Sequence, residues 1–258
     1  MNGTCKLCLR DGVELQRSHL LPAAIYRAIR GDIKDSNPNP WLITPNGAVQ
    51  TSRQDWAHLL CLDCEQRFSK NGEQWVFKNG LKADGSFQLS SVLASKLPDA
   101  SDPKSTTTKV YLASHIPEVD IPALTYFAAS MFWRASVHPW KSDKTIPVKL
   151  GPYREAFRQY LMGLAAFPEN TALWVVVRNG SEVNHVTHYP VSEKIKPHYT
   201  HRFPMPGFIF TLIVGQDIAD TYRSPCFVRG NGNPLIVSGV LEQFVLDAVV
   251  KMLDRSRA

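Results

Sequence analysis

Hydrophobic residues recur at helical spacing in several parts of the chain. The most apolar of these segments, residues 121–137, contains Phe127, Phe132 and Trp133, and we expect this helix to lie in the core. The other segments with helical spacing are 22–30, 153–165 and 241–253. Pro22 fits the first of these, because proline is tolerated at the start of a helix.

Runs of β-branched and aromatic residues predict strands, and turn-forming dipeptides separate them. The predicted strands are 13–16, 172–178 and 208–215. A turn at Asp11-Gly12 comes before the first of them. Asn179-Gly180 predicts a hairpin between the second strand and the residues that follow it. Residues 41–57 are ambiguous, and a strand pair around Asn46-Gly47 is one interpretation.

A polar segment divides the chain. Residues 95–109, SKLPDASDPKSTTTK, are rich in Pro, Ser and Thr and are typical of a linker. We therefore expect an N-terminal unit at 1–94 and a larger unit at 110–258. Because helices and strands are mixed in both, the predicted fold class is α+β.

The composition is that of an ordinary folded protein. Hydrophobic residues make up 44% of the 258 residues and charged residues 20%. No run approaches the ~18 apolar residues that a membrane helix needs, and MNGTCKLC lacks the apolar region of a secretory signal, so we expect a cytoplasmic protein with no membrane partner. The net charge of +6 is compatible with a nucleic-acid partner, but the basic residues are spread along the chain.

Four of the five cysteines form two Cys-x-x-Cys pairs, Cys5/Cys8 and Cys61/Cys64. In a reducing compartment such pairs indicate metal binding rather than disulfide bonds. Zinc(II) prefers four ligands in a tetrahedron, and each pair places two sulfurs on one tight turn. We predict that these cysteines bind one structural zinc ion with no open position for a substrate; the alternatives are coincidental pairs or a redox dithiol. Lone Cys226 is expected to be a small buried hydrophobe.

The motifs around these cysteines resemble the zinc-bearing HNH endonucleases, also called the ββα-metal or treble-clef nuclease group. The first pair is followed by SHLLP at 18–22 and then by LLCLDCE at 59–65. The resemblance covers about residues 1–80. It implies a zinc-bound, treble-clef, ββα-metal-like fold for the N-terminal unit. The residues after the second cysteine pair themselves predict a helix over 65–81, with an interruption at Asn71-Gly72.

The resemblance also implies roles for individual residues. His19 matches the general base that deprotonates the water attacking a phosphodiester, and an imidazole suits this role because its pKa is near neutrality. Glu65 matches the last position of the motif, which holds a divalent metal, and a carboxylate is a good ligand for Mg(II). Glu73, eight residues further along the helix, is a candidate for a second carboxylate.

This chain departs from the family pattern at two positions. Ser18 stands where an acid often precedes the histidine, and no Asn occurs near Asp55-Trp56, where the middle letter of the motif falls. Asp55 or His58 is a candidate for a third group. His185 and His188, three residues apart on a predicted strand, point to opposite faces and are interpreted as structural.

Two further histidines, His198 and His201, lie in the basic and aromatic segment KPHYTHRF. Such a segment can bind nucleic acid by stacking, although a loop or the start of a strand explains it as well.

The predicted function is therefore a metal-dependent endonuclease that hydrolyses phosphodiester bonds in DNA, with bacterial defence against phage as a context that only the family suggests. Residues 110–258 would select the target or bind a protein partner or a second copy of the chain. One alternative is a non-catalytic, zinc-stabilised module that binds nucleic acid or protein. The other is a structural zinc protein that acts through a pocket in its C-terminal unit.

Overall fold

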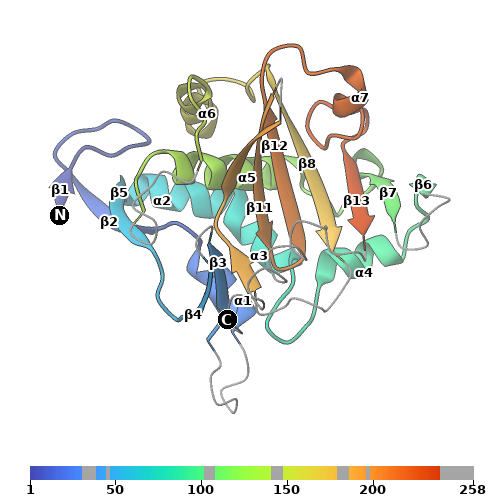
Figure 1. The fold of residues 1–258 in the computed structure, drawn as a ribbon, viewed down its shortest axis with the longest axis horizontal. Helices are drawn as coiled ribbons and strands as arrows, with labels where there is room; N and C mark the ends of the chain where they lie inside the picture. Colours follow the sequence, from blue (N-terminus) through green and yellow to red (C-terminus); the bar gives the residue numbers. More distant parts are fainter. Residues whose placement is uncertain are drawn as a thin grey trace.

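The computed structural model describes residues 1–30, 39–44, 47–101, 108–140, 148–178, 186–195 and 198–238 (Figure 1). The fold is mixed α+β, as the sequence predicts. The helices are α1 Ala23–Ile29, α2 Leu62–Phe68, α3 Gln74–Asn79, α4 Gln88–Ala94, α5 Ile121–Ser136, α6 Tyr153–Met162 and α7 Asp220–Arg223. A π-helical segment, Ser69–Glu73, joins α2 to α3, and a 3₁₀ turn covers Ala113–His115.

In the described ranges, the strands form three sheets. The first sheet has the order β1-β2-β5, with β1 Asn2–Gly3, β2 Val13–His19 and β5 Trp56–Cys61. The second has the order β10-β11-β12-β8-β13-β7-β6, with β10 Val191–Ile195, β11 His198–Met205, β12 Phe208–Val214, β8 Thr171–Arg178, β13 Pro234–Ser238, β7 Lys109–Leu112 and β6 Ala100–Ser101. The third has the order β4-β3-β9, with β4 Gly47–Gln50, β3 Trp41–Thr44 and β9 Val186–His188.

In the first sheet, β2 and β5 are antiparallel and α2 follows β5 without a loop. Leu15 pairs with Cys61, and His19, the last residue of β2, pairs with Trp56. α2 then begins at Leu62, with Cys61 as its N-cap. The second cysteine pair therefore spans the change from strand to helix.

The helix predicted after the second cysteine pair is present, and the interruption expected at Asn71-Gly72 is a π-helical segment. The main chain stays helical from α2 through Ser69–Glu73 to α3, but this segment forms a wider turn. Gly72 lies against the backbone of α5: a Cβ built on it would be 2.9 Å from both the Cα and the N of Phe127. Only a residue without a side chain lets these two helices approach so closely.

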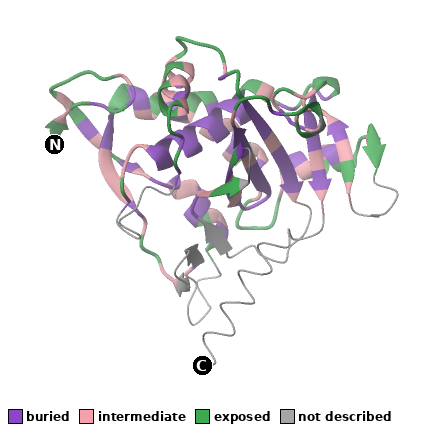
Figure 2. Cartoon of the chain, turned by 45° about the horizontal axis from the view of Figure 1, so that its top comes forward, coloured by how far each residue is buried: buried purple, intermediate pink, exposed green. Residues whose placement is uncertain are grey.

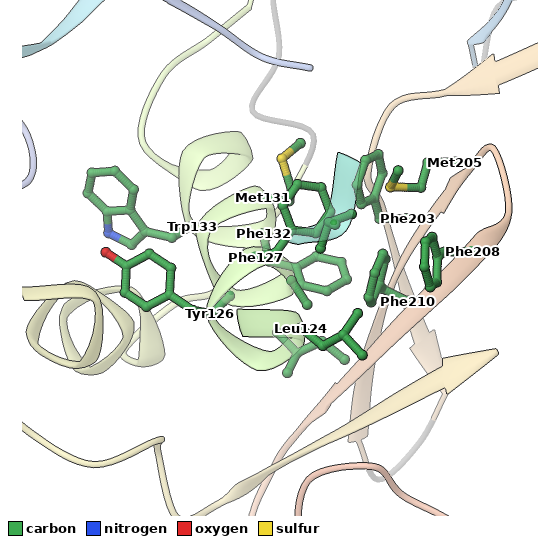
Figure 3. Packing of buried hydrophobic residues seen from close by; sticks show 14 of the residues in the cluster. Leu124, Tyr126, Phe127, Met131, Phe132, Trp133, Phe203, Met205, Phe208 and Phe210 are labelled. Carbon is green, nitrogen blue, oxygen red and sulfur yellow. The ribbon is translucent and has the colours of Figure 1, made fainter. Parts of the chain in front are cut away.

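Helix α5 is buried along almost its whole length, from Ala123 to Ser136, as its apolar sequence predicts. Figure 3 shows Phe127 and Phe132 on the side of the helix that faces Phe203 and Phe210 of the large sheet. The ring of Phe127 lies 5.6 Å from that of Phe210, measured between centroids.

The opposite side of α5 packs on α2. Tyr126 and Trp133 point away from the large sheet in Figure 3. Their rings make edge contacts with Phe68 of α2, at centroid distances of 6.1 and 6.0 Å. Helix α5 is thus a layer between the cysteine-bearing residues and the large sheet, and Figure 2 shows the buried residues concentrated there.

One predicted pairing is wrong. The residues after β8 do not return as its hairpin partner, because β9 pairs in parallel with β3 in another sheet, while β8 is flanked by β12 and β13. The Asn179-Gly180 turn itself lies outside the described residues, as do His185 and the helix predicted at 241–253. The strand pair suggested around Asn46-Gly47 is present as β3 and β4.

The division at 95–109 stays a prediction. Within the described residues, one hydrophobic cluster includes residues from both sides of it, among them Phe68 and Phe127, and Ala100–Ser101 of this segment form the edge strand β6. None of the helices in the described ranges is long and apolar enough to cross a membrane.

Replacing Gly72 with alanine tests the contact between the π-helical segment and α5. The new methyl group would overlap backbone atoms of Phe127, which cannot move as a side-chain end can. We expect the free energy of unfolding to fall by about 1–2 kcal/mol in denaturant titration, because overpacking outweighs the gain in helix propensity. Lys70→Ala, at an exposed position of the same segment, is the control and should change stability by less than about 0.5 kcal/mol. Equal stability of the two variants would contradict the close contact.

Candidate functional site

The four predicted zinc ligands come together in the structure. The sulfur atoms of Cys5, Cys8, Cys61 and Cys64 all lie within 4.8 Å of one another, and this is the one group of three or more metal-ligating side chains among the described residues. The Cys8 and Cys61 sulfurs are 3.8 Å apart. A tetrahedral shell with Zn–S bonds of about 2.3 Å also separates its sulfurs by about 3.8 Å. The cluster can therefore hold a metal ion such as zinc.

The main chain holds the two cysteine pairs together. The Lys6 amide donates to the Leu59 carbonyl oxygen at 2.9 Å, which ties the first turn to β5. The Cys61 amide donates to the Cys5 sulfur at 3.4 Å. Leu9, the residue after the first pair, has a φ of 60°, and this strained conformation lets the chain turn back so that the Cys5 amide reaches the Arg10 carbonyl.

The crowded thiol groups interact with one another. The Cys64 thiol donates a hydrogen bond to the Cys5 sulfur, which lowers the pKa of Cys5 to about 4 and raises the pKa of Cys64. Arg10 contributes positive charge, because its Nη2 lies 3.2 Å from the Cys61 sulfur and its Nε lies 3.4 Å from the Cys8 sulfur. Four thiolates around a divalent ion would carry excess negative charge, and the Arg10 guanidinium group would offset part of it.

A separate cleft lies between the end of β2 and the continuous helical segment formed by α2, Ser69–Glu73 and α3. Its volume is about 300 Å³, and His19, Glu65 and Glu73 all line it. The remaining lining residues are Pro22, Ala23, Ala24, Arg27, Ser69, Gln74, Phe77 and Arg134. The structure thus brings the three predicted catalytic residues to one cleft, although His19 precedes the two glutamates by more than 40 residues.

His19 is half-buried at the end of β2. Burial lowers the pKa of its imidazole below 6.5, and the positive charges of Arg134 and Arg17 lower it further, while Glu65 has the opposite effect. The side chain is therefore neutral at pH 7, which is the form that can accept a proton.

Glu65 lies in the first turn of α2, immediately after Cys64. The hydroxyl of Ser18 donates a hydrogen bond to its carboxylate. Ser18 is fully buried, so this contact fixes the Glu65 side chain against the end of β2. Ser18 therefore orients the Glu65 carboxylate.

Glu73 forms an ion pair with a residue from the C-terminal part of the chain. Arg134 Nη2 donates to its carboxylate at 3.1 Å. The other terminal nitrogen of Arg134, Nη1, donates to the backbone carbonyl of His19 at 2.9 Å. The Arg134 side chain is only 2% exposed, and its guanidinium group also lies over the ring of Phe68.

The two candidates for a third group do not line the cleft. His58 Nδ1 lies 3.0 Å from the Leu15 carbonyl oxygen, where it supports the pairing of β2 with β5. Asp55 is buried beside the entry to β5, and its carbonyl accepts from the Leu20 amide at 2.8 Å.

Three residues of this region were not predicted from the sequence as site residues: Ser18, Arg27 and Arg134. Arg134 had a recognisable signal, because a charged residue within an apolar helix is seldom buried unless it is paired. His198 and His201, considered for nucleic-acid binding, are instead buried in β11, and Cys226 is buried as expected.

Comparison of the chain with protein-family models, curated proteins and solved structures found no match.

The protonation of His19 can be measured directly. We expect its imidazole to titrate with a midpoint below 6.5 in an NMR titration, assigned with a His19→Gln variant. Because the unfolded chain binds this proton more readily, His19 also predicts a loss of stability as the pH falls below about 6.5. A midpoint at or above 6.5 would mean that the cleft does not keep this side chain neutral.

Proposed function

We propose that the protein is a metal-dependent endonuclease of the HNH type, acting on DNA. One observation carries this proposal: His19 and Glu65, both matched to the motif from sequence alone, line the same cleft together with the candidate carboxylate of Glu73. The antiparallel β2 and β5 followed directly by α2 also agree with the ββα order of that family.

The ion at the four cysteines is proposed to be zinc with a structural role. The donor set is four sulfurs, and the sulfur spacing fits Zn–S bonds. All four positions of a tetrahedral shell would be filled by the protein, so this ion would stabilise the fold without binding substrate. It would also fix the start of α2, and hence the position of Glu65.

In the proposed reaction, His19 accepts a proton from the attacking water. The water oxygen then bonds to phosphorus, and the bond from phosphorus to the leaving oxygen breaks. Arg134 holds the His19 backbone, and Ser18 holds Glu65 opposite it. General base catalysis of this kind typically accounts for a rate factor of 10²–10⁴.

A divalent cation at Glu65 would neutralise charge that develops on the phosphate and leaving oxygens. The residues present fit magnesium better than a metal that needs a protein cage. Outside the cysteine group, no described cluster brings three ligand atoms within 4.8 Å, and magnesium is usually bound by one or two carboxylates with water and substrate phosphate completing the shell.

The position of Arg27 favours an anionic substrate. It is exposed in the last turn of α1, it lines the cleft, and none of the described acidic residues pairs with it. A guanidinium group in this position can bind a phosphate oxygen of a nucleic-acid backbone. The C-terminal part of the chain is then left to select the target or to bind a protein partner.

The metal content of the purified protein tests the zinc proposal. We expect about one zinc ion per chain by elemental analysis, and far less in Cys61→Ser, because a hydroxyl group is a poor replacement for a thiolate ligand. The matched control is Cys226→Ser, which removes a buried thiol outside the cluster and should retain zinc. Equal zinc in both variants would rule out the cysteine site.

The nuclease proposal is tested on plasmid DNA with Mg(II), Mn(II) or EDTA. We expect cutting that requires a divalent ion and falls on the order of 10²–10⁴-fold in His19→Ala, since the base is lost. The matched control is His115→Ala, an exposed histidine away from the cleft.

Zinc content and circular dichroism should be unchanged in both histidine variants. Full activity in folded His19→Ala would exclude His19 as the base. DNA binding without cutting under any metal would favour the alternative of a non-catalytic nucleic-acid-binding module.

A further inference from the structure

We propose that Glu73 and Arg134 are a positioning pair for His19, so that the cleft is completed by helix α5 and Glu73 is not a metal ligand. This inference deepens the proposed nuclease function and rests on it for its kinetic test. It gives the predicted catalytic residue Glu73 a different role, and it adds Arg134 from α5, in the middle of the chain.

The geometry of Arg134 carries the inference. Its two terminal nitrogens donate to the His19 carbonyl and to the Glu73 carboxylate at 2.9 and 3.1 Å. Because a guanidinium group is planar and rigid, these two bonds fix the end of β2 relative to the π-helical segment. Arg134 touches the main chain of His19 and not its ring, so it sets where the imidazole lies without taking part in proton transfer.

The burial of Arg134 explains why Glu73 stays paired with it. An arginine that is 2% exposed needs a partner for its charge, and Glu73 is the carboxylate it contacts. A carboxylate already bound to a guanidinium group is a poor ligand for a second cation. Glu65 differs, because its partner is the neutral hydroxyl of Ser18, so its negative charge remains available.

A second, partly buried arginine provides a matched comparison. Arg158 of α6 also reaches the N-terminal part of the chain, where its Nη1 donates to the Leu7 carbonyl at 2.7 Å. Its side chain is 14% exposed and pairs with Glu155. Arg158 does not line the cleft. The two arginines therefore make the same kind of contact, but only Arg134 reaches His19.

The first measurement is hydrogen exchange by mass spectrometry on the full chain, which needs no enzyme activity. In Arg134→Gln we expect amide exchange over residues 17–24 to become at least tenfold faster, while the peptide around Leu7 keeps its rate. Arg158→Gln should give the reverse pattern. Unchanged exchange over 17–24 in folded Arg134→Gln would overturn the proposal, whether or not the protein is a nuclease.

The second measurement is kinetic and separates positioning from general destabilisation. We expect Arg134→Ala to lower kcat on the order of 10²-fold, with KM for DNA within about threefold of the parent value, because a small displacement of a catalytic group has an effect of this size. Millimolar guanidinium ion should restore part of kcat, and Arg134→Lys should lie between the parent and Arg134→Ala. A loss that appears only in KM, or that guanidinium does not reduce, would contradict a positioning role.

Glu73→Gln distinguishes the two roles of this residue. The amide oxygen can still accept from Arg134, so a positioning residue should lose less than about tenfold in kcat and keep the same magnesium concentration for half-maximal activity. If Glu73 were a metal ligand, that concentration would rise by tenfold or more, and this result would overturn the assignment. If the parent enzyme shows no cutting, the proposed nuclease function fails, and the exchange measurement alone decides the Arg134 contact.

Discussion

Helix α5 has almost no side that faces water, and the rest of the structure depends on this constraint. A helix that is apolar all round must be covered on every side. Here the large sheet covers one side with Phe203 and Phe210, while α2 covers the other with Phe68. The cysteine-bearing part of the chain is therefore one of the two layers that shield α5 from solvent.

The same constraint sets the electrostatics of the cleft. A charge on a fully covered helix is expensive to desolvate, so Arg134 is kept only because its nitrogens find acceptors, although its Nε has no hydrogen-bond partner in the structure. The acceptors come from β2 and from the π-helical segment. Packing of α5 and formation of the cleft therefore depend on each other, because the buried Arg134 donates its hydrogen bonds to His19 and Glu73.

Local patterns were sufficient for part of this site. Cys-x-x-Cys spacing identifies the metal cluster because the ligands lie on short turns, and helical periodicity identifies α5 because its burial is a property of its own sequence. His19 and Glu65 could be selected only through a resemblance, and the structure places both on one cleft. Their catalytic roles remain the proposal made above.

Long-range pairing was not predictable in the same way. A turn-forming dipeptide such as Asn179-Gly180 favours a hairpin locally, yet β8 already has partners on both edges, and β9 joins β3 instead. The role of Arg134 depends on a contact between residues 115 positions apart in the sequence, and no local pattern contains it. The role of Ser18 likewise depends on a contact with Glu65, 47 positions further along the chain.

Because of the π-helical segment Ser69–Glu73, the positions of Glu73 and Gly72 depend on the exact number of residues in this part of the chain. Such a turn accommodates one more residue than an α-helical path of the same course, and each residue of an α-helix advances the side chains by about 100°. Loss of a single amino acid between Cys64 and Gln74 would therefore rotate Glu73 away from Arg134 and take Gly72 from its place against Phe127. Over this stretch, natural variation should appear as substitutions, with insertions and deletions excluded.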